Sequence, residues 1–153
     1  MSCCQTQVRP ILLFVQKVHL AVIDRLEDLI EGELSPRAQF LADYLLKQER
    51  LLEEAVHQGL KRADAGTLNA FVDAKPSLDA SGAFEPARIP DSPTVDDLTG
   101  TIFTTRDALI EVLRESARCA TDRKVKELLL SFWKLEEAER NQMACSVMQL
   151  DGL

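Results

Sequence analysis

The sequence has few of the residues that mark catalytic or nucleic-acid-binding chains. Of its 153 residues only two are histidine, and acidic residues outnumber basic ones 25 to 18, which gives a formal net charge of −7. An acidic chain with no segregated basic patch is not expected to bind nucleic acid or an anionic membrane. No serine or cysteine has a credible histidine partner, and Gly-rich phosphate loops are absent, so the sequence predicts no catalytic residues and no nucleophilic enzyme.

The four cysteines do not form the pattern of a disulfide framework or a zinc site. Cys119 and Cys145 fall inside helical patterns, while Cys3 and Cys4 are adjacent near the N-terminus. A reducing compartment is the simplest explanation. We expect residues 1–9 to be a flexible tail, and the alternative for Cys3 and Cys4 is attachment of a metal or an acyl group.

Long hydrophobic runs are also lacking. The apolar stretch from residue 11 to residue 23 is interrupted by Lys17 and His19, and no small-residue cleavage site follows before Asp24. It is too short and too polar to span a bilayer or to act as a signal segment. These features predict a cytoplasmic protein without a membrane partner.

The residues that are present predict one all-α domain spanning residues 1–153. Composition is ordinary for a globular protein, with 46% hydrophobic and 28% charged residues. Ser-Pro pairs and an Asp stand where helices should begin, because an N-cap followed by an N1 proline favours a helix start. The expected helices run from near Pro10 to Gly32, from Ser35-Pro36 to about Lys61, from Ser92-Pro93 to about Ala120, and from Asp122 to about Leu150.

The connection between the two pairs of helices, residues 63–92, is long and contains most of the helix-breaking positions. We expect a short helical turn near residues 67–74, and docking of Leu68, Phe71, Val72 and Phe84 onto the helices. Two helical hairpins joined by such a crossover predict an antiparallel four-helix bundle with the connectivity of ferritin-like folds.

A repeated pattern places one glutamate on each apolar stripe of the second and fourth helices. Ser35-Pro36 leads to Glu49, and Asp122-Arg123 leads to Glu136 at the same offset. A carboxylate on a buried helical face must find a cation, a metal or a hydrogen-bond donor. The two stripes, spaced by three or four residues, are Leu41, Leu45, Glu49, Leu52 and Val56, and Leu128, Phe132, Glu136, Glu139 and Met143.

The hairpin geometry places two further polar residues at the same height. Leu34 lies in the first turn, and His19 and Glu49 are equally far from it along the sequence, one before it and one after it. Arg106 and Glu136 are likewise equally far from the second turn, on either side of it. At 1.5 Å per residue, all four lie roughly 22 Å from their turns. We therefore predict a core polar network of His19, Glu49, Arg106 and Glu136.

This layout resembles the ferritin-like superfamily, in particular its rubrerythrin-type branch. The resemblance implies a Glu-x-x-His motif on the second and fourth helices and a di-iron centre held by four carboxylates and two imidazoles. The family's histidine positions fall here on Leu52 and Glu139, and its other glutamates fall on His19 and Arg106. Only two of the six positions therefore keep the expected residue type.

The departures predict a degenerate metal site. The Arg106 guanidinium is permanently charged, so it repels a divalent metal and can neutralise Glu49 and Glu136. We expect an oligomeric interaction or adaptor protein that has lost its metal centre and its cofactor, rather than an enzyme. The alternatives are a mononuclear iron or manganese site on His19, Glu49, Glu136 and Glu139 with redox or peroxide-handling activity, or a register slip that turns Asp24 or Asp107 inward.

Three further features carry expectations of their own. The one literal Glu-x-x-His, Glu54 to His57, is interpreted as a solvated surface pair. Trp133 is expected at a core edge or an oligomer contact, and the same two positions are the alternatives for Tyr44 with Phe40. The first helix is apolar on more than one face, which predicts a homodimer packed through it or the crossover lying over it.

Overall fold

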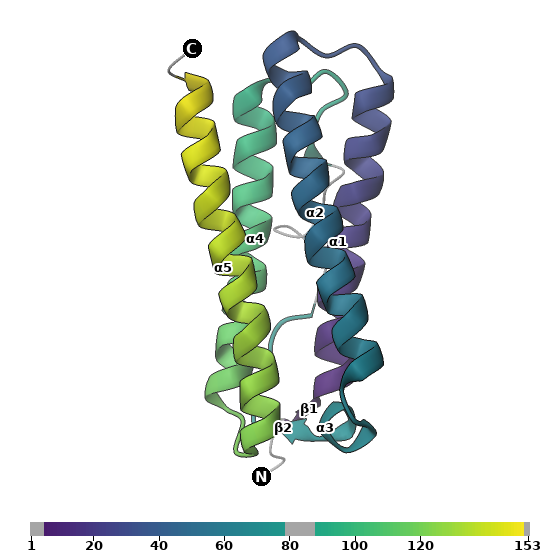
Figure 1. The fold of residues 1–153 in the computed structure, drawn as a ribbon, viewed down its shortest axis with the longest axis vertical. Helices are drawn as coiled ribbons and strands as arrows, with labels where there is room; N and C mark the ends of the chain where they lie inside the picture. Colours follow the sequence, from purple (N-terminus) through teal and green to yellow (C-terminus); the bar gives the residue numbers. More distant parts are fainter. Residues whose placement is uncertain (1–4, 79–87, 152–153) are drawn as a thin grey trace.

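The computed structural model describes residues 5–78 and 88–151, and this part of the chain is all-α, as predicted. Four long helices lie side by side along the long axis of the molecule (Figure 1). Their bounds are α1 Val8–Glu31, α2 Pro36–Arg62, α4 Val95–Arg118 and α5 Arg123–Asp151, and a short helix, α3 Ala65–Asn69, lies between the pairs.

The long helices form two antiparallel hairpins, because the turns after α1 and after α4 are each only four residues long. In Figure 1, α1 and α5 run upward, while α2 and α4 run downward. The predicted caps of the second helix of each hairpin are present. Ser35 Oγ accepts from the Ala38 amide at 3.2 Å, and Asp122 Oδ1 accepts from the Val125 amide at 3.1 Å. Each cap satisfies a backbone donor that the helix itself leaves free.

The predicted start of α4 at Ser92-Pro93 is wrong by two residues. Thr94 is the N-cap, and its hydroxyl accepts from the Asp97 amide while Asp97 Oδ2 accepts from the Thr94 amide. This reciprocal capping box satisfies two backbone donors, whereas a serine cap alone satisfies one. Pro93 precedes the helix and is buried.

The predicted flexible tail over residues 1–9 is wrong for its described part. Thr6–Gln7 form strand β1, which pairs antiparallel with β2, Phe71–Val72, and α1 begins directly afterwards at Val8. The Val8 amide donates to the Ala70 carbonyl at 3.0 Å, so the crossover holds the start of α1 in place. The small sheet is a tertiary pairing between residues far apart in sequence, which local patterns do not predict.

The anchors expected in the crossover are only partly correct. Leu68 and Val72 are buried, but Phe71 is 56% exposed, because neighbouring residues of a strand point to opposite sides. The helical turn expected at residues 67–74 is α3, which ends at Asn69 where the chain enters β2. Phe84 and the Cys3-Cys4 pair lie outside the described residues.

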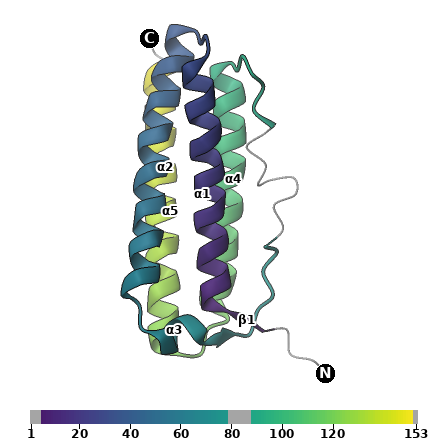
Figure 2. The ribbon, with the colours of Figure 1, turned by 90° about the vertical axis from the view of Figure 1, so that its right-hand side faces the viewer.

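The described part of the crossover after β2 runs along the side of the molecule on which α1 and α4 lie, away from α2 and α5 (Figure 2). Arg25 of α1 donates to the Ile89 carbonyl and pairs with Asp91 at 3.0 Å, and the Ile89 side chain is fully buried. The crossover therefore covers part of the second apolar face of α1. Leu13 and Leu20 on this helix stay about half exposed, at 48% and 44%.

The apolar core is divided into two clusters along the helix axes. The lower one, near the α4–α5 turn, includes Val18, Val56, Leu109 and Phe132. The upper one, near the α1–α2 turn, includes Val22, Leu45, Ile102 and Met143. On α5 the inward position is Leu129 rather than the predicted Leu128, which is half-buried. Among the described residues no helix has the length and apolarity to cross a membrane.

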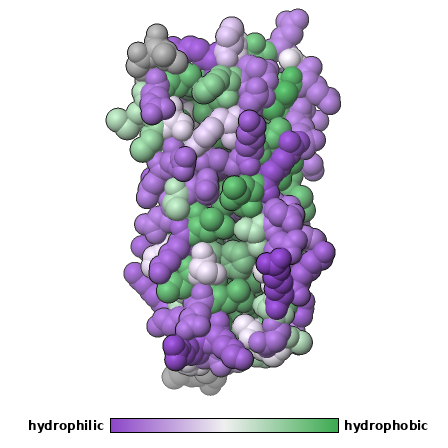
Figure 3. All heavy atoms as spheres, in the orientation of Figure 1, coloured by the Kyte–Doolittle hydropathy of each residue, from purple (hydrophilic) through white to green (hydrophobic). Residues whose placement is uncertain are grey.

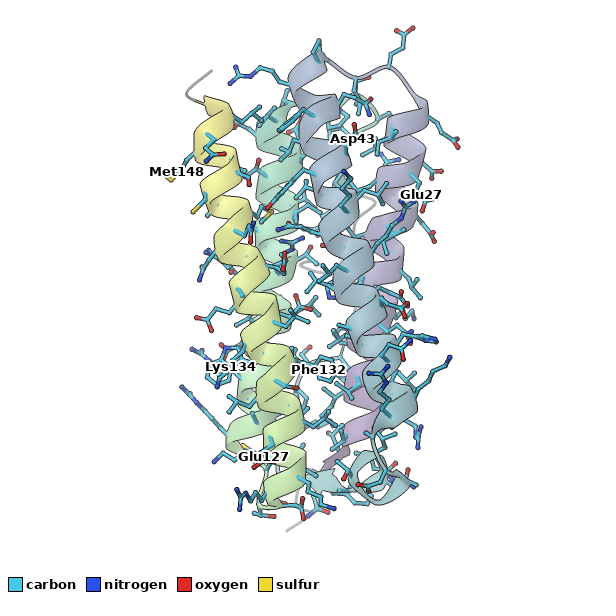
Figure 4. All side chains as sticks on the ribbon, viewed as in Figure 1. Glu27, Asp43, Glu127, Phe132, Lys134 and Met148 are labelled. Carbon is cyan, nitrogen blue, oxygen red and sulfur yellow. The ribbon has the colours of Figure 1, made fainter. Side chains whose placement is uncertain are left out.

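Gly59 gives Phe132 its place in the lower cluster. Figure 4 shows Phe132 directed from α5 toward α2, and a Cβ atom at Gly59 would lie 2.4 Å from its ring. A side chain at this position would therefore require the Phe132 ring to shift, although glycine in a helix interior costs about 1 kcal/mol relative to alanine.

We expect Gly59→Ala to destabilise the protein by about 1–3 kcal/mol, because overpacking outweighs the gain in helix propensity. Gly100 is the matched control, since a Cβ atom at this position would meet nothing within 4 Å. Gly100→Ala should stabilise the protein, and urea denaturation measures both variants. A stabilising Gly59→Ala would mean that the Phe132 ring moves freely.

Candidate functional site

The four residues of the predicted polar network meet at the middle of the four long helices. α1 contributes His19, α2 contributes Glu49, α4 contributes Arg106 and α5 contributes Glu136. Their exposed fractions are 1%, 1%, 0% and 2%. Each belongs to the inward stripe of its helix, so the same three- and four-residue spacing that buries leucines also buries these charges.

The His19 ring lies between the two acids. Nδ1 lies 2.5 Å from Glu49 Oε2, and Nε2 contacts Glu136 Oε1. An imidazole has a donor on both nitrogens only when it is protonated. A ring bound to two carboxylates is therefore held as an imidazolium that links α2 to α5 through α1.

Arg106 holds the other side of Glu49. Its Nη2 and Nε atoms donate to Glu49 Oε1 at 3.0 Å and 3.3 Å, and its Nη1 donates to Gln48 Oε1 at 2.7 Å and to the Glu139 carbonyl at 3.3 Å. Glu49 thus accepts from one cation on each oxygen. The guanidinium fork suits such a multiply bonded, fully buried position.

Gln48 is a network residue that the sequence patterns did not identify. It is 6% exposed, and its Nε2 donates to Tyr44 Oη at 2.9 Å and to the Glu139 carbonyl and carboxylate at 3.1 Å. Its spacing of three from Leu45 and four from Leu52 is that of a buried position. That spacing was a signal for burial, although a glutamine next to a buried glutamate does not reveal its partners.

Burial and charge act in opposite directions on the pKa values of this network. Burial lowers the pKa of His19, but the nearby Glu136 and Glu49 carboxylates outweigh it and raise the pKa to about 10. Burial raises the pKa of Glu49, but His19 and Arg106 outweigh it and lower the pKa below its ordinary value. His19 is therefore protonated and Glu49 ionised at pH 7.

One oxygen of the network has no partner among the described residues. Glu136 Oε2 is buried and accepts no hydrogen bond, although Oε1 of the same carboxylate faces His19. An orphaned acceptor of this kind costs free energy unless a proton, a water molecule or a cation reaches it. It is the one point where the network, within the described part of the chain, is chemically incomplete.

The donor set does not fit the di-metal centre that the ferritin-like resemblance implies. Such a centre needs several free carboxylate oxygens and imidazole lone pairs facing one point. Here both His19 nitrogens and three of the four oxygens of Glu49 and Glu136 are engaged within the network. Arg106 adds a fixed positive charge next to Glu49. Within residues 5–78 and 88–151 no group of three His, Cys, Asp or Glu is arranged to hold a metal ion.

The remaining candidate ligands are not brought to this layer. The Glu139 carboxylate is half-buried and turns toward Gln48. Asp24 and Asp107, which a register slip would turn inward, are exposed, and Asp107 pairs with Arg140 at 2.5 Å.

The literal Glu-x-x-His motif does not act as a unit. Glu54 is exposed and accepts from Gln58 at 2.7 Å. The half-buried His57 instead lies 3.4 Å from Gln16, which donates to Glu53 at 3.0 Å.

Tyr44 is an aromatic residue that bonds to the network, because its hydroxyl accepts from Gln48 Nε2. Trp133 is half-buried and packs on the lower core cluster, Tyr44 packs on the upper cluster, and Phe40 is 63% exposed. Cys119 is half-buried and Cys145 is exposed, and both are free thiols.

No family model, curated protein or solved structure matches this chain.

Replacing Arg106 with leucine tests its part in the network. The variant would leave Glu49 with a single cation in the core, and breaking a buried ion pair costs about 3–5 kcal/mol. The control is Arg50→Leu on α2, because Arg50 pairs with Glu27 on the surface and is 58% exposed. That control should change the free energy of unfolding by less than about 0.5 kcal/mol. Urea denaturation at pH 7 measures both, and equal small effects would contradict burial of Arg106.

The stability of the protein should depend on pH through His19. Its pKa is about 10 in the folded chain and about 6.5 when unfolded, so the native state holds an extra proton between these values. The stabilisation is complete below pH 6.5, and the free energy of unfolding should fall by up to about 1.4 kcal/mol per pH unit above it.

The lowered pKa of Glu49 acts at the acid end, where its stabilisation is lost as the pH falls below 4.5. Denaturation between about pH 2.5 and pH 9.5 measures both limbs, and His19→Gln should flatten the alkaline limb. A wild-type stability that stays constant from pH 6.5 to pH 9.5 would contradict a protonated His19.

Proposed function

We propose that this protein is a ferritin-like four-helix bundle in which an internal ion-pair network occupies the position of the metal centre, and that it acts as an oligomeric interaction or adaptor protein. The directions of the helices support the bundle, because α1 and α5 run one way and α2 and α4 the other, with the long crossover between the hairpins (Figures 1 and 2).

The observation that carries this proposal is the position of His19 between Glu49 and Glu136. The imidazolium takes the place between two acids that a metal cation would otherwise take, and Arg106 supplies the second positive charge. Two buried carboxylates balanced by two buried cations need no ion from solution. The interior is then a structural device, and the binding activity belongs to the surface.

A second candidate is a metal-binding protein with redox or peroxide-handling activity. One observation favours it, namely that Glu136 Oε2 is buried without a partner among the described residues. A single iron or manganese ion could use this oxygen only if His19 were deprotonated and released from one acid. The raised pKa of His19 opposes that release at neutral pH.

Metal analysis combined with thermal melting separates the two candidates. We expect protein purified without chelator to contain less than about 0.1 metal ion per chain, and its melting temperature to be unchanged by iron(II), manganese(II) or zinc(II), because a ligand stabilises only what it binds. His19→Ala is the companion variant, because it removes the imidazole and opens space for a metal ion between Glu49 and Glu136. Stoichiometric metal in the wild-type protein, or a melting temperature raised by added metal, would contradict the proposal.

A further inference from the structure

We infer that a second copy of this chain docks on the face formed by α2 and α5, so that α2 of each copy packs on α5 of the other. This inference rests on the proposed function, because it identifies the partner of an interaction protein. Figure 3 shows apolar side chains gathered along the middle of the face on which α2 and α5 lie in Figure 1, between hydrophilic margins.

The face is a continuous groove made of three adjoining hollows. Phe40 and Tyr44 border the first, Tyr44 and Gln142 the second, and Gln142 and Ser146 the third, with volumes of about 410, 350 and 450 Å³. Both helices line the first two hollows and α5 alone lines the third. Because neighbouring hollows share lining residues, they form one surface rather than separate small-molecule sites.

The lining of the groove is poorer in charged residues than the chain as a whole. The described residues that line it include only two charged ones, Lys47 and Glu139, in a chain of which 28% is charged. Phe40 and Leu51 on its α2 side are 63% and 51% exposed. Depletion of charge with exposed aromatic and aliphatic side chains is typical of the buried centre of an interface.

The two sides of the groove differ in size in a way that suits self-association. α2 contributes the large side chains Phe40, Tyr44 and Leu51, whereas α5 contributes the small Ala138 and Ser146 beside the flexible polar side chains of Gln142 and Gln149. A two-fold axis parallel to the helices would place α2 of one copy over α5 of the other at the same height. Phe40 of each copy would then lie opposite Ser146 and Gln149 of the other, and the two halves of the contact would be equivalent, as in an isologous interface.

The same axis also pairs the two charges. Lys47 on α2 and Glu139 on α5 line the same hollow, so they stand at one height. Across the two-fold axis, Lys47 of each copy would face the partner's Glu139. This pairing of opposite charges across the contact matters because each copy carries a net charge of −7, and two acidic surfaces repel one another.

Sedimentation equilibrium of the full-length protein tests the inference. At about 100 µM chain, above the Kd of a weak specific interface, we expect a dimer. Ala138→Glu should weaken it at least tenfold, because it adds bulk and an unpaired charge opposite the partner's α2. Met148→Glu is the matched control, because Met148 is 73% exposed and points away from α2 in Figure 4.

A charge exchange tests the orientation of the two copies. Lys47→Glu should give a monomer because it faces the partner's Glu139, and adding Gln142→Lys to the same chain should restore the dimer. A wild-type monomer would overturn the inference, as would equal effects of Ala138→Glu and Met148→Glu. Dissociation by Leu20→Glu but not by Ala138→Glu would overturn it in favour of a contact through α1.

The failure of this inference can be distinguished from failure of the proposed function. A monomer whose interior is free of metal would overturn the α2–α5 contact and leave the ion-pair core standing. A dimer that contains stoichiometric metal and responds to Ala138→Glu as expected would support the contact while contradicting the metal-independent core.

Discussion

The interaction on which the rest of this structure depends is the pair of contacts between the His19 ring and the carboxylates of Glu49 and Glu136. Burial opposes the ionised form of Glu49, which His19 and Arg106 stabilise, and it opposes the protonated form of His19, which the nearby carboxylates stabilise. The charged form of each of these residues is therefore stable in the core only while its charged partners are present. Arg106 completes the balance and ties α4 to α2.

This mutual dependence also fixes the relative heights of the helices. An apolar core tolerates sliding of one helix along another, since one leucine replaces the next with modest loss. A buried charge does not, because a shift of one turn would separate it from its partner. The network lies between two apolar clusters, so a single polar layer sets the register for both. A polar residue that specifies register in this way is known from helical assemblies in general.

The division between interior and surface follows from the same chemistry. Among the described residues of the network, Glu136 Oε2 is a buried oxygen without a hydrogen-bond partner. The hydrogen bonds of the network reach the surface through Gln48, Tyr44 and Glu139. These three residues line the α2–α5 groove. These hydrogen bonds restrain side chains that line the groove, and restrained side chains lose less entropy when a partner binds.

The sequence by itself determined the all-α fold, the two capped hairpins and the inward positions of His19, Glu49, Arg106 and Glu136. These follow from short-range rules, because helical periodicity and hairpin symmetry need only the spacing of residues along the chain. The tertiary structure alone decided the β1–β2 pairing, the exposure of Phe71, the place of Gln48 in the network and the orphaned oxygen of Glu136. Those features depend on side-chain rotamers and on contacts between residues distant in sequence, and no local pattern specifies them.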